Sequence, residues 1–173
     1  MGDDKLLLMY KEKTLLQRAI ELLSGLPVYE KIIVSAGAWY VKLKLPPDVR
    51  LLVNPCPEIG QSGSVRLGLE AATGTHYLFL AADQPKLSPA DLIPILELAE
   101  SNPDKIIFPV IDKKPNSPTL FPAFFRTELL GLTGDSGGRP VRDSHPEVCF
   151  SAEPEHPENF TDIDCLEDYQ ALI

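Results

Sequence analysis

Short apolar runs that alternate with amphipathic segments are the feature that most restricts the fold of this chain. Apolar runs occupy residues 31–35, 49–53, 77–82, 106–110, 118–121 and 148–152. Apolar residues recur at helical spacing in residues 14–23, 62–72, 88–100 and 122–130, and a short helix is expected from about residue 165. Strands that are apolar on both faces and alternate with helices are typical of a mostly parallel sheet covered on both sides. We therefore predict one α/β domain over residues 1–173.

The size and charge of the chain restrict its partners. With 173 residues, of which 44% are hydrophobic, it is long enough to bury one sizeable core. Its formal net charge of -9 argues against a nucleic-acid or anionic-membrane partner, because such partners are usually met by a basic face. An acidic protein that binds phosphates needs a region of positive electrostatic potential at the binding site, and a divalent metal supplies this most simply.

Targeting signals and thiol or imidazole sites are not evident in the sequence. The N-terminus is polar, and no apolar run approaches the ~20 residues of a membrane span, so a cytoplasmic protein is expected. The three cysteines have no ligand spacing, and reduced thiols are expected. The three histidines are scattered, and we assign them no chemistry.

The apolar run at residues 77–82 delivers Asp83 at its carboxyl end, followed by Gln84 and Pro85. Ligands of parallel α/β sheets bind beyond the carboxyl ends of the strands. Mg²⁺ takes one or two carboxylates and leaves room for phosphates and water. Asp83 is therefore a candidate metal ligand, and the alternative is that it only starts the turn before Pro85.

A second acidic segment lies near the end of the chain. Asp162 and Asp164 flank Ile163, so on an extended segment both carboxylates lie on one side. Either is a candidate second metal ligand. The alternative for Asp164 is the N-cap of the short helix that follows, a role compatible with metal binding.

Two glycine-containing loops are further candidates. Residues 54–65 join an apolar run to a helix and carry Asn54, Gly60, Ser62 and Ser64, whose polar groups suit an anion or a nucleobase at a helix start. Residues 134–139 carry Asp135 between glycines. A helix cap explains the first loop and a surface turn the second, if neither binds a ligand.

Six short segments follow one another in an order known from one family. They are residues 1–7 (Met-Gly-Asp-Asp-Lys-Leu-Leu), 54–65, 82–85 (Ala-Asp-Gln-Pro), 117–121, 134–137 (Gly-Asp-Ser-Gly) and 163–168 (Ile-Asp-Cys-Leu-Glu-Asp). In this order they resemble the AAGxSxRMGxxKLL signature, the NPxxxxGxxxSL loop, the DQP turn, the GxPxLF strand, the GDxG loop and the DIDTPEDY-like ending of the molybdenum cofactor cytidylyltransferases and their guanylyltransferase relatives. The resemblance covers nearly all of the chain.

The resemblance implies a Rossmann-like nucleotidyltransferase domain that transfers CMP from CTP to molybdopterin or the molybdenum cofactor. It implies Asp83 and Asp164 as ligands of Mg²⁺ and Lys5 beside the nucleotide phosphates. It places Asn54, Gly60, Ser62 and Ser64 near the nucleoside or the pterin, and Asp135 on the acceptor side. Within the family, Gln84 favours the cytidylyl over the guanylyl branch. A molybdenum hydroxylase is the implied client.

The family's AAGxSxR loop, which wraps the triphosphate with backbone N–H groups, would precede Met1 together with a central strand. Without this loop, weak CTP binding and slow turnover are expected. The open alternatives are a start site upstream of Met1, a shortened non-catalytic accessory paralogue, and a guanylyl- or sugar-phosphate nucleotidyltransferase of the same fold. The strands at residues 32–35 and 77–81 would flank the absent strand. We expect them either to pair directly or to accept a strand from a second copy, which would make a homodimer.

Overall fold

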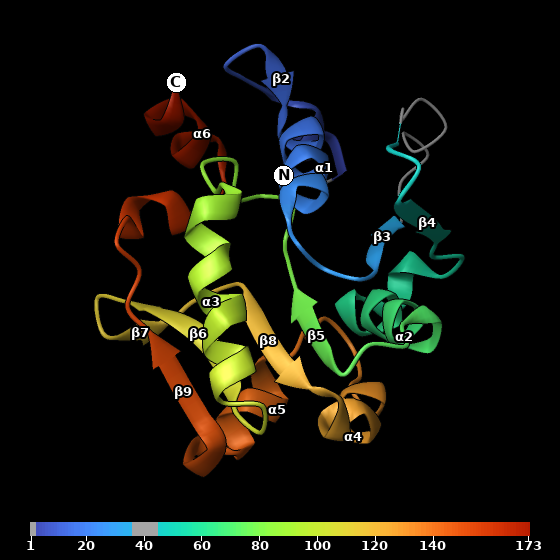
Figure 1. The fold of residues 1–173 in the computed structure, drawn as a ribbon. Helices are drawn as coiled ribbons and strands as arrows, with labels where there is room; N and C mark the ends of the chain where they lie inside the picture. The colour runs from blue at the N-terminus through green and yellow to red at the C-terminus, as the bar shows by residue number, and fades with distance from the viewer. Residues whose placement is uncertain (1–2, 36–44) are drawn as a thin grey trace.

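Two main sheets with helices on either side, together with a two-stranded hairpin, make up the described part of the fold (Figure 1). The computed structural model describes residues 3–35 and 45–173, so Met1 and Gly2 of the opening motif lie outside the described residues. Within these residues no helix combines the length and the apolar character needed to cross a membrane. The smaller sheet pairs β3 (Lys31–Ser35) with β4 (Val49–Val53) in parallel. Both strands have the bounds predicted from the sequence.

The larger, five-stranded sheet has the order β5-β8-β6-β7, with β9 also paired to β6. Its strands are β5 (His76–Phe79), β6 (Ile106–Ile111), β7 (Lys114–Pro115), β8 (Thr119–Pro122) and β9 (Cys149–Ala152). Strand β9 runs parallel to β6, whereas β8 is antiparallel to both β5 and β6. The α/β class is confirmed, but the sheet is mixed rather than mostly parallel. The connection from β6 to β8 is too short for the crossover helix that parallel strands require.

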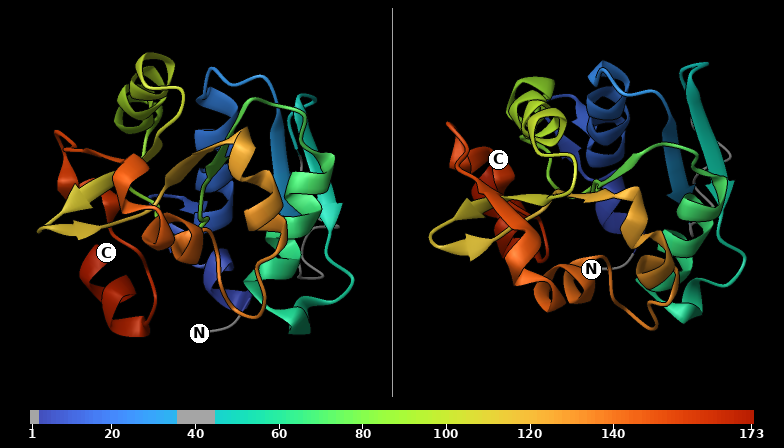
Figure 2. Two further views of the ribbon diagram at one scale, coloured as in Figure 1. Left: turned by 90° about the horizontal axis from the view of Figure 1, so that it is seen from below. Right: turned by 60° about the horizontal axis from the view of Figure 1, so that its bottom comes forward.

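Apart from the last one, which packs against Tyr10, Leu15 and Ile163, the helices form one layer on each side of the larger sheet (Figure 2). They are α1 (Leu15–Gly25), α2 (Gln61–Ala71), α3 (Pro89–Ser101), α4 (Arg126–Leu130), α5 (Arg139–Ser144) and α6 (Leu166–Leu172). Helices α1 and α3 pack on one face, while α2, α4 and α5 pack on the other. Helix α5 was not predicted from the sequence, where its residues were assigned in part to a loop.

Alternating side chains of the sheet strands supply the two cores. Ile107 and Leu120 face α1 and α3, whereas their neighbours Ile106 and Phe121 face α2, α4 and α5. All four side chains are at most 2% exposed. The apolar runs therefore reflect burial on both faces, as expected for a covered sheet.

Strands β3 and β5 do not pair with each other. Within the described residues β3 pairs with β4 and β5 with β8, so the direct-pairing alternative is wrong. Strand β5 is an edge of its sheet. Helix α2 spans both sheets, because a Cβ on Gly68 would lie 3.5 Å from Val34 of β3, while Leu69 packs with Tyr77 of β5. Strand donation by a second copy stays a prediction.

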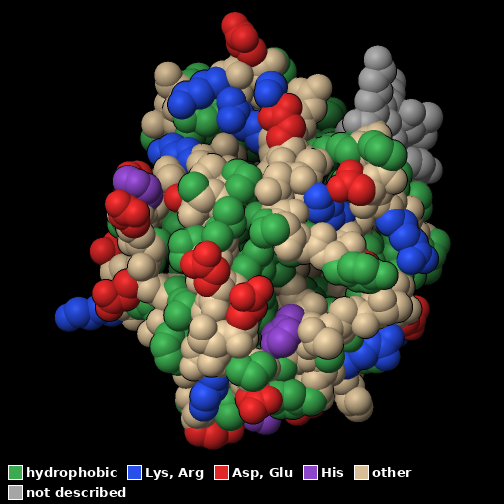
Figure 3. Space-filling model, in the orientation of Figure 1, with side chains coloured by type: hydrophobic (Ala, Val, Ile, Leu, Met, Phe, Trp, Pro, Cys, Tyr) green, Lys and Arg blue, Asp and Glu red, His purple; other side chains and the backbone are tan. Residues whose placement is uncertain are grey.

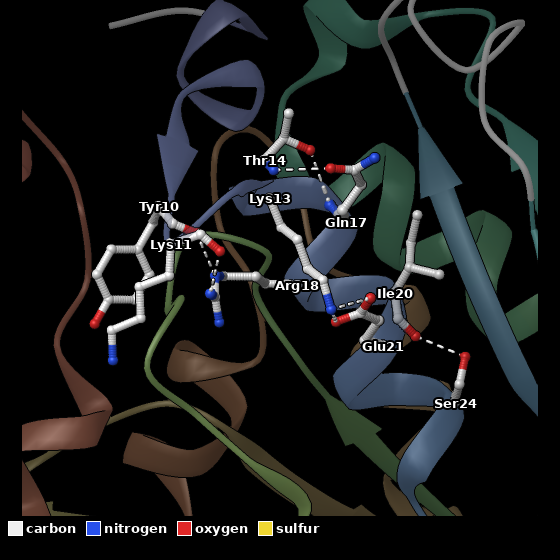
Figure 4. Close-up of polar contacts among 9 residues, drawn as sticks. All are labelled: Tyr10, Lys11, Lys13, Thr14, Gln17, Arg18, Ile20, Glu21 and Ser24. Atoms are coloured by element: carbon white, nitrogen blue, oxygen red, sulfur yellow. Dashed lines mark hydrogen bonds and ion pairs between the residues drawn. The ribbon is translucent and has the colours of Figure 1, made fainter.

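A hairpin precedes α1 and was not predicted. Strands β1 (Met9–Tyr10) and β2 (Lys13–Thr14) are antiparallel, and the turn residues Lys11 and Glu12 have positive φ angles. Thr14 and Gln17 then form a capping box at the start of α1 (Figure 4). The hairpin therefore fixes the direction in which the chain enters α1.

Candidate functional site

One ammonium group joins two carboxylates that are distant in the sequence. Nζ of Lys5 lies 2.8 Å from Oδ2 of Asp83 and 3.6 Å from Oδ1 of Asp164. Lys5 belongs to a 3-10 helix (Asp3–Leu7), Asp83 to the turn that follows β5, and Asp164 to the segment before α6. The structure thus brings Asp83 and Asp164 to one ammonium group, and a metal shared by them stays a prediction. Strand β5 ends at Phe79, earlier than the predicted residue 82, so Asp83 lies in the turn rather than at the strand's last residue.

The backbone fixes the two acidic segments against each other. The N–H of Ile163 donates to the carbonyl oxygen of Asp83 at 2.9 Å. The Ile163 side chain is only 1% exposed and packs with Tyr10 and Leu15. Because side chains alternate along an extended segment, this burial leaves Asp162 and Asp164 on the opposite side. The buried Ile163 therefore directs the carboxylates of Asp162 and Asp164 toward the Asp83 turn.

Gln84 supports the same turn from inside the protein. Its side chain is 4% exposed, and Nε2 donates to the carbonyl oxygens of Ser117 and Phe160 at 3.3 Å each. The residue therefore links the Asp83 turn to the start of β8 and to the acidic C-terminal segment. This structural role was not recognised in the sequence, where Gln84 was considered only as a mark of the cytidylyl branch.

The charges in this group perturb one another. Burial first, and then the charges of Asp83 and Asp164, raise the pKa of Asp162 from 3.8 to about 6. Partial burial of Lys5 lowers its pKa. The hydrogen bond and charge interaction with Asp83, together with the charge of Asp164, outweigh this effect and raise the pKa of Lys5 above its usual 10.5. Lys5 is therefore charged at neutral pH, and the carboxylates outnumber the cation that they share.

The N-cap predicted at Asp164 is wrong. Cys165 is the N-cap of α6, and Oδ2 of Asp168 accepts hydrogen bonds from the N–H groups of Asp164 and Cys165 at 2.9 and 2.8 Å. Asp168 takes this capping role because it lies in the first turn, where a carboxylate can reach back to the exposed N–H groups. The Asp164 carboxylate is therefore not used by the helix.

The acidic group suits a hard divalent cation. Oδ2 of Asp83 accepts from Lys5, but Oδ1 is buried and has no hydrogen-bond partner among the described residues. A buried carboxylate oxygen without a partner is costly, and a cation is its natural ligand. The described residues contain no ready cluster of three or more His, Cys, Asp or Glu ligands. Two carboxylates are nevertheless what Mg²⁺ uses when phosphates and water complete its shell.

The remaining candidate residues form a second group around the start of α2. Nδ2 of Asn54 donates to Oγ of Ser64 at 3.2 Å, while Oδ1 of Asn54 accepts from the N–H of Cys56 at 3.0 Å. Oδ1 of Asp135 accepts from the N–H of Gln61 at 3.2 Å. Asp135 therefore caps the start of α2 from a loop distant in the sequence.

Close backbone packing joins the two loops of this group. The N–H of Ser62 donates to the carbonyl oxygen of Gly134 at 3.1 Å, and a Cβ on Gly60 would lie 2.7 Å from the backbone of Gly134. The Ser62 side chain is 1% exposed, and its Oγ has no partner within the described part of the chain. Hydrogen bonds and ion pairs among the described residues do not connect this group to Lys5, Asp83 or Asp164. The sequence-predicted residues thus form two separate groups.

Asp162 is the member of the acidic group that the sequence left undecided. It was considered beside Asp164 because of the alternating Asp-Ile-Asp pattern, and the raised pKa now shows that it shares the field of Asp83 and Asp164. The alternating pattern was the available signal. The sequence could not show that Ile163 is anchored to the Asp83 turn.

The sequence model for the MobA-like NTP transferase domain matches residues 1–148. A search of curated proteins found no match. Among solved structures, Rv0371c from Mycobacterium tuberculosis H37Rv is similar with a TM-score of 0.80 at 21% identity, over 99% of this chain and 89% of that one. A second structure of Rv0371c is a complex with manganese.

Two further solved structures share the fold. A nucleotidyl transferase from Methanothermobacter thermautotroptrophicus has a TM-score of 0.77 at 24% identity, over 97% of this chain and 82% of that one. The 4-diphosphocytidyl-2C-methyl-D-erythritol synthase from Anaerococcus prevotii has a TM-score of 0.71 at 13% identity, over 95% and 86% of the two chains. At these identities the similarity demonstrates the fold alone.

Proposed function

This chain belongs to the MobA-like NTP transferase domain family, and from this premise we propose that it transfers CMP from CTP to molybdopterin or the molybdenum cofactor. The order of the six motifs supports this acceptor. Cytidylyl transfer is supported by the fold relatives, which include 4-diphosphocytidyl-2C-methyl-D-erythritol synthase and a CTP complex of CMP:2-keto-3-deoxy-manno-octonic acid synthetase. We propose a molybdenum hydroxylase as the client of the product.

The shared position of Lys5 between Asp83 and Asp164 carries the proposal. A cation already lies 2.8 and 3.6 Å from these carboxylates, and the other oxygen of Asp83 is buried without a partner in the described residues. We propose that Asp83 and Asp164 hold Mg²⁺. The manganese complex of Rv0371c supports a divalent metal in a protein of this fold.

The proposed reaction is attack by a terminal phosphate oxygen of the acceptor on the α-phosphorus of CTP, with pyrophosphate leaving. The bound metal neutralises negative charge that accumulates on the leaving group. Lys5 binds phosphate oxygens from the same side, because its raised pKa keeps the ammonium charged. The attacking group is already an anion, so neither a protein nucleophile nor a general base is required.

The group around α2 is proposed to hold the nucleoside and the acceptor. Asn54 and Ser64 orient each other, and Asp135 fixes the loop at residues 134–135 against Gln61. The unpartnered Oγ of Ser62 is a hydrogen-bonding group that a ligand or water could satisfy. A substrate bound across both groups would link the metal side to the α2 side.

The test measures Mn²⁺ binding by electron paramagnetic resonance and pyrophosphate release from CTP with molybdopterin. Asp83→Asn should abolish tight Mn²⁺ binding and reduce pyrophosphate release ~10²-fold or more. Asp112→Asn is the matched control, because Asp112 lies in the exposed β6–β7 turn and its substitution removes the same charge. Both measurements should be unchanged in this control.

The same assay separates the alternatives. Faster release from GTP than from CTP would replace the cytidylyl proposal with the guanylyl one. A sugar phosphate that replaces molybdopterin as the better acceptor would identify the third alternative. Asp83-dependent binding of Mn²⁺ and CTP without pyrophosphate release would favour an accessory role and refute the proposed transferase activity.

A further inference from the structure

A surface pocket of about 380 Å³ lies outside both groups of the proposed site. It is bounded by the β1–β2 hairpin, α1 and the turn that leads into α3. Its polar lining is provided by Tyr10, Lys11, Arg18, Lys86, Ser88 and Asn159. Three of these six residues are cationic, although the chain as a whole carries a net charge of -9. In Figure 3, Lys and Arg side chains gather over the end of the molecule that contains β2 and the start of α1.

Arg18 is fixed in this pocket by the hairpin. Its Nε donates to the carbonyl oxygen of Tyr10 at 2.8 Å, and Nη2 donates to that of Lys11 at 3.2 Å. The guanidinium carbon also lies 4.6 Å from the centre of the Tyr10 ring (Figure 4). A guanidinium held in this way has lost much of its rotamer freedom before any ligand arrives.

The carboxylates near the pocket already have partners. Glu21 pairs with Lys13 at 2.8 Å. Asp91 accepts from Oγ of Ser88 at 2.6 Å and from Nδ2 of Asn159 at 2.9 Å. No ion pair within residues 3–35 and 45–173 neutralises Lys11, Arg18 or Lys86. Three cations without an ion-pair partner among the described residues therefore line one cavity, against the single nearby charge of Asp91, and this balance favours an anion.

An adjoining pocket of about 170 Å³ extends the first along α1. It shares Arg18, Leu87 and Ser88 with the first pocket, and its apolar lining comes from Leu22, Leu87 and Pro89. A ligand that spans both has an anionic group near Lys11 and Lys86 and an apolar part against α1 and α3. Inorganic anions would fill only the first pocket.

We propose that these joined pockets bind a small phosphorylated molecule, with its phosphate among Lys11, Arg18 and Lys86 and its apolar part on Leu22, Leu87 and Pro89. The site is separate from the metal and nucleotide site proposed above. Lys86 nevertheless lies in the same turn as Asp83, so an occupied pocket fixes the segment that carries a proposed metal ligand.

The experiment is a residue-resolved amide NMR titration with inorganic phosphate and with phenyl phosphate, without divalent cations. Under these conditions the carboxylates around Lys5 repel anions. Both probes should shift the amides of Lys11, Lys86 and Ser88 in a saturable manner. Phenyl phosphate should bind about fivefold more tightly, as expected from removing roughly 40 Å² of apolar surface from water.

Three variants test the lysines. Lys11→Gln and Lys86→Gln should each weaken both probes about fivefold or more, because each removes one charged donor. Lys113→Gln is the matched control. It lies in the β6–β7 turn with a φ of 63°, as Lys11 lies in the β1–β2 turn with a φ of 46°. Its affinity should equal that of the unmodified chain.

Three results would overturn the proposal. The first is equal affinity of Lys11→Gln, Lys86→Gln and the unmodified chain. The second is equal weakening in Lys113→Gln, which would show a general surface-charge effect. The third is a set of shifts centred on Lys5 and Asp83, which would assign the phosphate to the proposed catalytic site.

Discussion

Gly60→Ala tests the packing of the two loops at the start of α2. Gly60 has φ 88° and ψ -168°, a region that residues with a Cβ rarely adopt. A Cβ at this position would lie 2.7 Å from the carbonyl carbon and oxygen of Gly134 and 2.8 Å from the backbone nitrogen of Asp135. These neighbours are backbone atoms, so relief requires that one whole loop moves.

The structure allows the cost to be estimated. The backbone strain alone costs about 1–3 kcal/mol. Displacement of the loop at residues 134–135 also weakens the hydrogen bonds that link it to Gln61 and Ser62, each worth about 1 kcal/mol. The total loss of unfolding free energy is therefore about 3–5 kcal/mol. Gly134→Ala is the control, because Gly134 also has a positive φ, of 65°, but a Cβ there meets nothing within 4 Å. That variant should lose only about 1–2 kcal/mol.

Urea unfolding followed by circular dichroism measures both losses. The slope with urea should be the same in the two variants, so that the midpoints report stability directly. Gly60→Ala should unfold at clearly lower urea than Gly134→Ala. If the two free energies of unfolding agree within about 0.5 kcal/mol, the proposed close approach of the loops is refuted, because strain at a positive φ would then explain both.

Three further predictions concern charge and packing. Burial and neighbouring carboxylates raise the pKa of Asp162 from 3.8 to about 6, so the folded protein holds this proton more tightly than the unfolded chain. The resulting contribution to the free energy of unfolding is complete below pH 3.8 and is lost as the pH rises through 6. Asp162→Asn should therefore raise the melting temperature at pH 7.5 but not at pH 3.5, and no difference at pH 7.5 would contradict the assigned environment. The hydrogen bond to Glu128, opposed by slight desolvation, raises the pKa of His145 above 6.5. The contribution of this ion pair to the free energy of unfolding is therefore present below pH 6.5 and is lost as the pH rises through the raised pKa. The melting temperature of His145→Gln should approach that of the unmodified chain between pH 6 and pH 9, and a constant difference would count against the ion pair. Leu92 is 0% exposed, and Leu92→Ala should cost about 2–5 kcal/mol in urea unfolding, whereas Leu166→Ala, at 52% exposure, should cost far less.

The sequence was most informative where one physical effect dominated. The runs of residues 31–35 and 49–53 match β3 and β4, because β-branched and apolar residues in a short run favour a strand, although most residues of these two strands are only half-buried or exposed. Ser88 precedes α3 as predicted, with Asp91 accepting from its N–H at 2.8 Å. In each case local sequence and tertiary packing favour the same structure.

Tertiary packing decided the features that the sequence did not show. The β1–β2 turn places Lys11 and Glu12 at positive φ, although neither is the Gly, Asn or Asp that usually marks such a turn. For the capping of α6 the sequence offered Asp164 alone, and Asp168 was not considered. Only the geometry of the first turn showed that Asp168 accepts the hydrogen bonds.

This difference in capping has a consequence for the proposed metal site. Asp164 is 77% exposed and contacts Lys5, so its carboxylate remains available to a ligand. Lys5 supplies one positive charge, whereas Asp83, Asp162 and Asp164 supply three negative charges when ionised. Burial, and to a smaller extent this repulsion, raises the pKa of Asp162, so that its carboxyl group is more readily protonated than that of an ordinary aspartate. A divalent cation would neutralise the remaining two charges and would favour ionised Asp162. A divalent cation would therefore relieve both the charge repulsion that contributes to the raised pKa of Asp162 and the missing partner of the buried Asp83 oxygen, and it is the ligand that the proposed function requires.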